Sequence, residues 1–135
     1  METTPESPRN LLIVEDHSNL RESLAFWLTD LFPDVVIHQA ANGEEGIATA
    51  SKIRPDVILM DIGLPGISGL EATKEILRRG IQSQVVILTI HEGQAYQNGA
   101  RDAGAIYFIT KREMYARLPE VIRAVLEKRN EEHGQ

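Results

Sequence analysis

Five short runs of consecutive apolar residues alternate along the chain with segments in which apolar residues recur every three or four positions. Runs of the first kind are typical of parallel strands covered on both faces, and spacing of the second kind is typical of amphipathic helices. The sequence therefore predicts five strand–helix units. The predicted strands are residues 10–15, 35–37, 57–60, 85–88 and 106–109.

The first three predicted helices have recognisable ends. Ser18 is the expected N-cap of the first helix, and Pro33 ends it. The second helix follows the turn at Asn42 and stops at Pro55, and the third ends near Gly80. Each helix is long enough to return the chain to the start of the next strand.

The last two helices differ in the strength of their apolar pattern. Residues 92–103 predict a weak helix whose inward side chains are all small: Ala95, Gly99 and Ala103. The final helix is expected to open at Pro119, because proline suits a first helical turn. Its apolar stripe consists of Leu118, Val121, Ile122, Val125 and Leu126.

Five such units are too few for an eight-stranded barrel, and they suit an open sheet. We expect an α/β fold with a doubly wound, five-stranded parallel sheet in the order 2-1-3-4-5, of the flavodoxin-like or CheY-like kind. In such a sheet the working site lies beyond the carboxyl ends of the strands, where the strand order reverses. That rule directs attention to the residues that follow each strand.

Composition narrows the class of protein. The 135 residues suffice for one domain, and 42% hydrophobic with 25% charged residues is ordinary for a globular chain. The expected divisions are a flexible N-terminal segment at 1–9, a single folded domain at 10–129, and a tail or start of a linker at 130–135.

No apolar run approaches the roughly 20 residues that cross a bilayer. The polar N-terminus is no secretory signal, so we expect a cytoplasmic protein without membrane contact.

Charge and cysteine content exclude further classes. The net charge of −6 repels a phosphate backbone, so we expect no direct nucleic-acid binding by this stretch. The absence of cysteine excludes disulfides, thiolate zinc sites and a cysteine nucleophile.

Polar residues follow four of the five predicted strands. They are Glu15 and Asp16 after the first strand, Asp61 after the third, Thr89 at the end of the fourth and Lys111 after the fifth. Three converging carboxylates repel one another unless a cation neutralises them. Carboxylate oxygens without cysteine or a nearby histidine favour Mg²⁺, with the backbone carbonyl of Gly63 as a further ligand.

A carboxylate beside Mg²⁺, a lysine and a hydroxyl suits phosphoryl transfer. Asp61 is placed to attack phosphorus and become an acyl phosphate. Lys111 would balance the charge of the transferred oxygens, and the Thr89 hydroxyl would bind one of them. Each residue alone is ordinary after a strand, but their coincidence at four strand ends favours the functional interpretation.

Four segments of the chain form a recognisable set: Leu11-Leu12-Ile13-Val14-Glu15-Asp16, Asp61-Ile62-Gly63-Leu64-Pro65-Gly66-Ile67-Ser68-Gly69, Ile87-Leu88-Thr89 and Gly104-Ala105-Ile106-Tyr107-Phe108-Ile109-Thr110-Lys111. Together they resemble the receiver domain of response regulators in two-component systems. The resemblance runs from about residue 10 to residue 128, and Gly104-Ala105 before the fifth strand, with Arg112 after the lysine, is nearest to the NarL/LuxR-type branch.

The resemblance implies a signalling role. It implies phosphate transfer from a histidine kinase to Asp61, with Glu15 and Asp16 as the acidic pair. It implies Thr89 as the switch hydroxyl and Phe108 as the switch aromatic. Phosphorylation would then change how the surface of the fourth helix, fifth strand and fifth helix binds an output domain, a partner protein or a second copy. Such a domain catalyses only its own phosphorylation and dephosphorylation.

Three other functions fit these residues less well. A haloacid-dehalogenase-type phosphohydrolase would carry a second aspartate two residues after the first, where this chain has Gly63. A flavodoxin-like electron carrier would need a phosphate loop after the first strand, and Glu15 and Asp16 would repel a flavin phosphate. A receiver-like module that only binds partners would not need the complete acceptor set.

Two residues are candidates for tuning phosphate lifetime. Gly63 and His91 each lie two positions beyond a predicted catalytic residue and so flank the path of an attacking water. An exposed loop histidine is the alternative interpretation of His91.

The polar C-terminal residues resemble the start of an interdomain linker. With the NarL/LuxR-type pattern, they imply a DNA-binding helix-turn-helix domain outside this chain and control of transcription. A freestanding receiver acting by protein–protein interaction or phosphorelay is the alternative.

Overall fold

The computed structural model describes residues 9–133, so most of the predicted N-terminal segment, with Gly134 and Gln135, lies outside the described residues. Five strands form one parallel sheet in the order β2-β1-β3-β4-β5, which confirms the predicted fold class. The strands are β1 (Arg9–Val14), β2 (Val35–Ala40), β3 (Val57–Met60), β4 (Gln84–Thr89) and β5 (Tyr107–Thr110).

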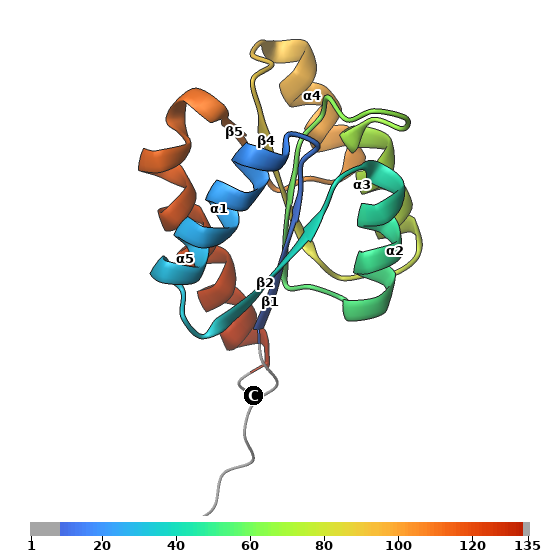
Figure 1. Ribbon diagram of the computed structural model, residues 1–135. Helices are drawn as coiled ribbons and strands as arrows, with labels where there is room; N and C mark the ends of the chain where they lie inside the picture. The colour runs from blue at the N-terminus through green and yellow to red at the C-terminus, as the bar shows by residue number, and fades with distance from the viewer. Residues whose placement is uncertain (1–8, 134–135) are drawn as a thin grey trace, which may run out of the picture.

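Helices cover both faces of this sheet (Figure 1). One face packs against the first and last helices, and the other packs against the three between them. The helices are α1 (Ser18–Leu31), α2 (Gly43–Ile53), α3 (Gly69–Arg78), α4 (Gln94–Ala103) and α5 (Met114–His133), with a short 3-10 turn η1 (Lys111–Glu113) before α5. None of these helices combines the length and apolar composition that crossing a membrane requires.

The continuous apolar runs serve two cores at once. In β1, Leu11 and Ile13 belong to the core on the α1–α5 side, and Leu12 and Val14 belong to the core on the α2–α4 side. Neighbouring side chains of a strand point to opposite faces, so a strand buried on both sides must be apolar throughout. This burial is what makes the polar residues directly after the strands conspicuous.

The predicted start of the last helix is wrong. The helix begins at Met114, and Pro119 lies inside it. Met114 and Leu118, four residues apart, are 6% and 0% exposed, so their burial continues the helix upstream of the proline. Proline at this position leaves the carbonyl of Tyr115 without its helical donor.

Three smaller predictions are also corrected. Ser18 is the first helical residue of α1 rather than its N-cap, because Glu15 accepts the N–H of His17 and holds His17 in the extended cap position without a side-chain cap. Ala95 is exposed in the first turn of α4, and Ala100 is buried instead. Ile106 lies before β5 and is 46% exposed.

The C-terminal boundary differs in one respect from the expected tail. The helix α5 continues through His133, so residues 130–133 are helical. The division into a receiver at 10–129 and a linker beyond it remains a prediction.

Candidate functional site

Backbone hydrogen bonds extend the sheet by one residue and fix two acidic side chains at its carboxyl edge. The N–H of Glu15 donates to the carbonyl of Ala40 at 3.1 Å, and the N–H of Asp61 donates to the carbonyl of Val14 at 3.2 Å. Glu15 is 2% exposed and Asp61 is 6% exposed. Glu15 after β1 and Asp61 after β3 therefore place buried carboxylates at the same carboxyl edge of the sheet.

Lys111 joins these two carboxylates. Its Nζ lies 2.8 Å from Oε1 of Glu15 and 3.3 Å from Oδ2 of Asp61. Burial is the largest single influence on the ammonium and opposes its charge. Hydrogen bonding to Glu15 and the charges of Asp61 and Glu15 together outweigh burial and raise the pKa of Lys111 above its ordinary value. Lys111, which follows β5, is therefore a fixed cation between the carboxylates that follow β1 and β3.

The second oxygen of Glu15 faces away from Lys111, toward the start of α1. Oε2 of Glu15 accepts the backbone N–H of His17 at 3.1 Å and lies 3.1 Å from its Nδ1. The same Nδ1 is 3.6 Å from Oδ1 of Asp16. One donor atom from each of Glu15, Asp16 and His17 lies within 4.8 Å of the other two.

This cluster fits a divalent cation. Among the residues that the structure describes, Asp16 supplies the one buried side-chain oxygen, Oδ1, that has no hydrogen-bond partner. A buried, unpaired carboxylate oxygen is costly unless a proton donor or a cation reaches it. Asp61 lies outside this cluster; its Oδ1 accepts the N–H of Gly63 at 3.4 Å, and its Oδ2 faces Lys111.

Thr89 and His91 approach the site from the end of β4. Thr89 is fully buried, and its Oγ1 accepts the N–H of His91 at 3.2 Å. A Cβ placed on Gly63 would lie 3.3 Å from Nε2 of His91. The His91 ring also stacks on Tyr96 of α4, with ring centroids 4.8 Å apart. His91 therefore lies against the loop after Asp61 and also contacts α4.

Phe108 lies in β5, three residues before Lys111. It is half-buried and packs against the core on the α2–α4 side, and it lines a small hollow with Ala100 and Arg101 of α4. Its carbonyl accepts Nη1 of Arg117 from α5 at 3.4 Å. The predicted switch aromatic thus touches α4 through its side chain and α5 through its backbone.

Sequence reasoning missed two features of this edge. His17 was not among the predicted site residues, although its adjacency to Glu15 and Asp16 was a signal of a shared site. Gly69 was not among them either, and the capping box of Ser68 and Glu71 makes it the first residue of α3. A Cβ on Gly69 would collide with the backbone carbonyl of Asp61, so only glycine lets α3 begin against that residue.

The chain belongs to the response regulator receiver domain family. The family model described as "Response regulator receiver domain" matches residues 11–123. A receiver is a signalling domain rather than a classical enzyme, and the family resemblance drawn from the sequence is confirmed.

Individual relatives support the NarL/LuxR-type assignment. The chain is 37% identical over 115 residues to the response regulator GacA of Pseudomonas viridiflava, covering 85% of this chain and 54% of GacA. It is 37% identical over 117 residues to the transcriptional regulatory protein LiaR of Bacillus subtilis, covering 84% and 54%. The chain therefore spans about half the length of these two relatives.

A solved structure supports the same assignment. The crystal structure of a LuxR-family two-component response regulator from Aurantimonas sp. superposes with a TM-score of 0.82 at 32% identity. The match covers 90% of this chain and 87% of that one.

Proposed function

We propose that this chain is the phosphoacceptor of a two-component pathway and that Asp61 takes up the phosphoryl group of a histidine kinase. The observation that carries the proposal is the buried Asp61 carboxylate at the sheet edge, 3.3 Å from the ammonium of Lys111. Family membership supports the assignment of a kinase as the donor.

The transfer exchanges one bond to phosphorus for another. A carboxylate oxygen of Asp61 forms the new P–O bond, the P–N bond to the kinase histidine breaks, and the leaving imidazole recovers its electron pair and takes a proton. Lys111 neutralises charge on the transferred oxygens, and Thr89 donates its hydroxyl hydrogen to one of them. Glu15 and Asp16, with Asp61 and the Gly63 carbonyl, would hold Mg²⁺, which supplies further neutralisation when bound.

Phosphoryl uptake can be tested with acetyl phosphate and Mg²⁺. Intact-mass spectrometry should show one added phosphate in the parent chain and none in Asp61→Asn or after Mg²⁺ is chelated. Asp56→Asn is a matched control, because Asp56 precedes the same strand at the opposite edge. Label retained by Asp61→Asn would refute the acceptor assignment.

Thr89 and Phe108 would convert phosphorylation into a change of surface. When Thr89 turns its hydroxyl toward the phosphoryl group, the hydrogen bond from the His91 N–H is disturbed, and His91 stacks on Tyr96 of α4. Movement of this loop would let Phe108 repack against α4. Amide chemical shifts of α4 should change on phosphorylation in the parent chain and change much less in Thr89→Ala.

Gly63 and His91 would set the lifetime of the acyl phosphate. Nε2 of His91 lies close to Gly63, 3.3 Å from the position that a Cβ on this glycine would take. His91→Ala should therefore change the dephosphorylation rate several-fold, about 1 kcal/mol in the barrier. Equal decay rates in the parent and in the variant would assign His91 to an ordinary loop role.

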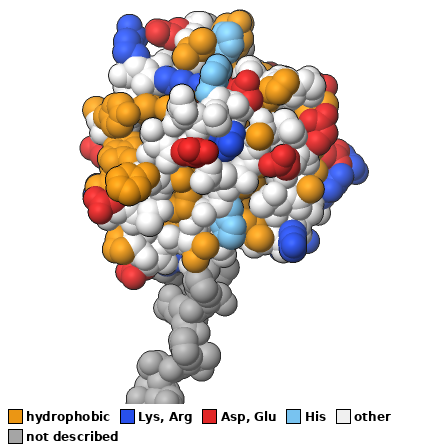
Figure 2. Space-filling view, viewed as in Figure 1, with side chains coloured by type: hydrophobic (Ala, Val, Ile, Leu, Met, Phe, Trp, Pro, Cys, Tyr) orange, Lys and Arg blue, Asp and Glu red, His pale blue; other side chains and the backbone are white. Residues whose placement is uncertain are grey.

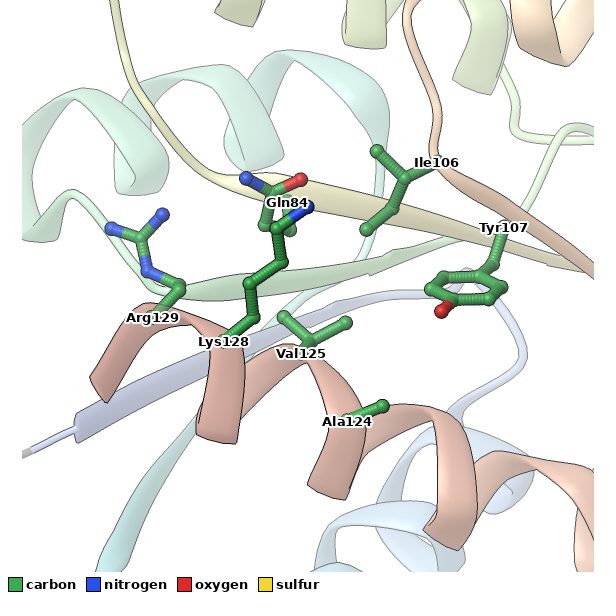
Figure 3. A pocket seen from close by; sticks show the side chains of 7 residues that line it. All are labelled: Gln84, Ile106, Tyr107, Ala124, Val125, Lys128 and Arg129. Atoms are coloured by element: carbon green, nitrogen blue, oxygen red, sulfur yellow. The ribbon is translucent and has the colours of Figure 1, made fainter. Parts of the chain in front are cut away.

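The switched partner surface is proposed on α4, β5 and α5. Ile106 and Tyr107 are 46% and 36% exposed there. A pocket of about 250 Å³ lies beside them and is also lined by Val125 and Lys128 of α5 (Figure 3). This surface would bind an output domain, another protein or a second copy after phosphorylation.

Another exposed group of aromatic side chains makes a useful comparison. Figure 2 shows hydrophobic side chains gathered over the α1 and α5 side of the molecule. Phe26 and Tyr115 are 81% and 64% exposed. If phosphorylation causes dimerisation through the α4–β5–α5 face, Tyr107→Ala should weaken the phosphorylated dimer in sedimentation experiments and Phe26→Ala should not. The opposite result would move the interface to α1.

The pathway output is proposed to be transcription. The chain spans about half the length of relatives that include a transcriptional regulatory protein. Its net charge of −6 disfavours binding to DNA by this chain itself. A DNA-binding domain outside this chain would read the sequence. An open reading frame that continues past Gln135 into a helix-turn-helix domain is the expected finding. A stop codon at that point would favour the freestanding receiver.

A further inference from the structure

The backbone carbonyl of Glu15 lies just past the end of β1, where the sheet no longer supplies it with a partner. The N–H of Glu15 donates to the carbonyl of Ala40, so in a continued parallel ladder the N–H of Asn42 would donate to the carbonyl of Glu15. Asn42 is instead the N-cap of α2. No backbone N–H of residues 9–133 donates to the Glu15 carbonyl, which therefore needs a donor from a side chain or from water.

Arg21, in the first turn of α1, supplies that donor. Its Nη1 donates to the carbonyl of Glu15 at 2.8 Å, and its Nε donates to Oε1 of Gln39 in β2 at 3.2 Å. The residue itself is half-buried. Because the guanidinium is a rigid planar fork, two hydrogen bonds to different segments fix its plane. The side chain of Arg21 therefore takes the place of the missing ladder bond and joins the ends of β1 and β2.

This hydrogen bond fixes the peptide unit between the two neighbouring acidic residues. The carbonyl of Glu15 and the N–H of Asp16 belong to one planar group, so a donor on the oxygen sets the direction of the backbone that enters Asp16. The Glu15 side chain is also held by Lys111 and by the N–H of His17. Oδ1 of Asp16 has no hydrogen-bond partner among the described residues. The position of the Asp16 carboxylate therefore depends more on its backbone than that of Glu15 does.

We propose that Arg21 is a positioning residue for phosphoryl uptake: through the carbonyl of Glu15 it holds Asp16 where its carboxylate can bind Mg²⁺. The inference rests on the proposed function, since that function makes Asp16 a ligand of the cation. Arg21 acts through the backbone and is not itself a ligand. The alternative is that Arg21 only ties α1 to β2 through Gln39 and contributes to folding.

Calorimetric titration of the full chain with Mg²⁺, without a phosphodonor, tests the positioning role. Arg21→Gln should raise the Mg²⁺ dissociation constant by about tenfold or more, the usual effect of losing a group that orients a ligand. Arg21→Lys keeps the charge and a donor and should recover part of the affinity. Gln39→Ala is the matched control, because it removes only the other partner of the guanidinium. An unchanged constant in Arg21→Gln, no recovery in Arg21→Lys, or an equal loss in Gln39→Ala overturns the proposal.

The kinetics of phosphoryl uptake separate positioning from a general loss of folded protein. With acetyl phosphate, the Mg²⁺ concentration that gives half the maximal rate should rise in Arg21→Gln by the same factor as the dissociation constant. The rate at saturating Mg²⁺ should approach that of the parent chain. A fall in the rate by one factor at every Mg²⁺ concentration would assign Arg21 to folding alone and overturn the proposal. Failure of the parent chain to take up phosphate would refute the proposed function, and the calorimetric comparison would still decide the role of Arg21.

Discussion

Charged groups lie at both ends of the parallel strands, and the two sets are paired differently. The ends where the strands start are called the amino edge, and the ends where they finish are called the carboxyl edge. At the amino edge, Asp56 accepts the N–H of Asn10 at 2.9 Å with one oxygen and Nε of Arg129 at 3.1 Å with the other. Arg129 also donates to the carbonyl of Gln82 at 2.7 Å. One carboxylate meets one guanidinium, and these hydrogen bonds join α5 to the starts of β1 and β4.

At the carboxyl edge the charges do not balance. Glu15, Asp16 and Asp61 supply three carboxylates, and Lys111 is the cation that contacts two of them. The third carboxylate keeps Oδ1 buried without a hydrogen-bond partner among the described residues. A balanced pair stabilises one arrangement, whereas an excess of buried negative charge favours binding of a cation. The comparison therefore separates a structural edge from a binding edge.

Loss of Lys111 should produce the largest effect on stability. Lys111→Met leaves the buried carboxylates of Glu15 and Asp61 without a cation, which should cost about 3 kcal/mol of unfolding free energy in the presence of a metal chelator. Excess Mg²⁺ should recover part of the loss. Urea unfolding measures both values. Arg112→Met is the control, because its pair with Glu92 is exposed and worth under about 1 kcal/mol. Equal losses in the two variants would contradict the prediction.

Loss of the amino-edge cation should cost less and should not respond to metal. Arg129→Met removes hydrogen bonds to Asp56 and Gln82, with an expected loss of about 1–3 kcal/mol. Phosphoryl uptake by Asp61 should stay at the parent level. Lys128→Met is a neighbouring, exposed control. Recovery of Arg129→Met by Mg²⁺ would show that the two edges are not independent.

Neutralising one aspartate at each edge should change stability in opposite directions. Asp61→Asn removes one of the crowded carboxylates while Lys111 keeps its shorter contact to Glu15, so stability should rise by about 1 kcal/mol without metal. Asp56→Asn weakens a balanced pair and should lower stability by about 1 kcal/mol. Parallel urea titrations compare the two. Changes of the same sign would remove the distinction between the edges.

The carboxyl edge was more predictable from sequence than the amino edge. A buried strand is apolar on both faces, so Glu15, Asp61 and Lys111 mark where burial ends, and the parallel order brings those ends together. The amino-edge pair of Asp56 and Arg129 is 73 positions apart and follows no strand pattern. The distance between Asp56 and Arg129 depends on how α5 packs against the sheet, and this packing cannot be inferred from local sequence.

Other predictions were wrong because they also depended on packing that local sequence does not show. The proline rule places Pro119 at a helix start, but burial of Met114 and Leu118 against the sheet extends the helix past it. Helical spacing predicts which residues share a face, yet it could not show that Ala95 lies in an exposed first turn. The position of His17 beside Asp16 required side-chain geometry, because adjacency along the chain does not fix direction.

The smallest expected effect is the pH dependence of the Lys111 pairs. The pKa of Lys111 is raised in the folded chain from the ordinary 10.5, so the unfolded chain loses its proton first as pH rises. The stabilisation is fully present below pH 10.5 and is lost as pH passes through the higher folded value. In chelator, the difference in unfolding free energy between the parent chain and Lys111→Met should therefore shrink above that pH. Groups common to both proteins titrate alike and cancel in this difference. A difference that stays constant from neutral to strongly alkaline pH would mean that the ammonium charge of Lys111 does not stabilise the carboxyl edge, leaving only the packing of its side chain to explain the loss in Lys111→Met.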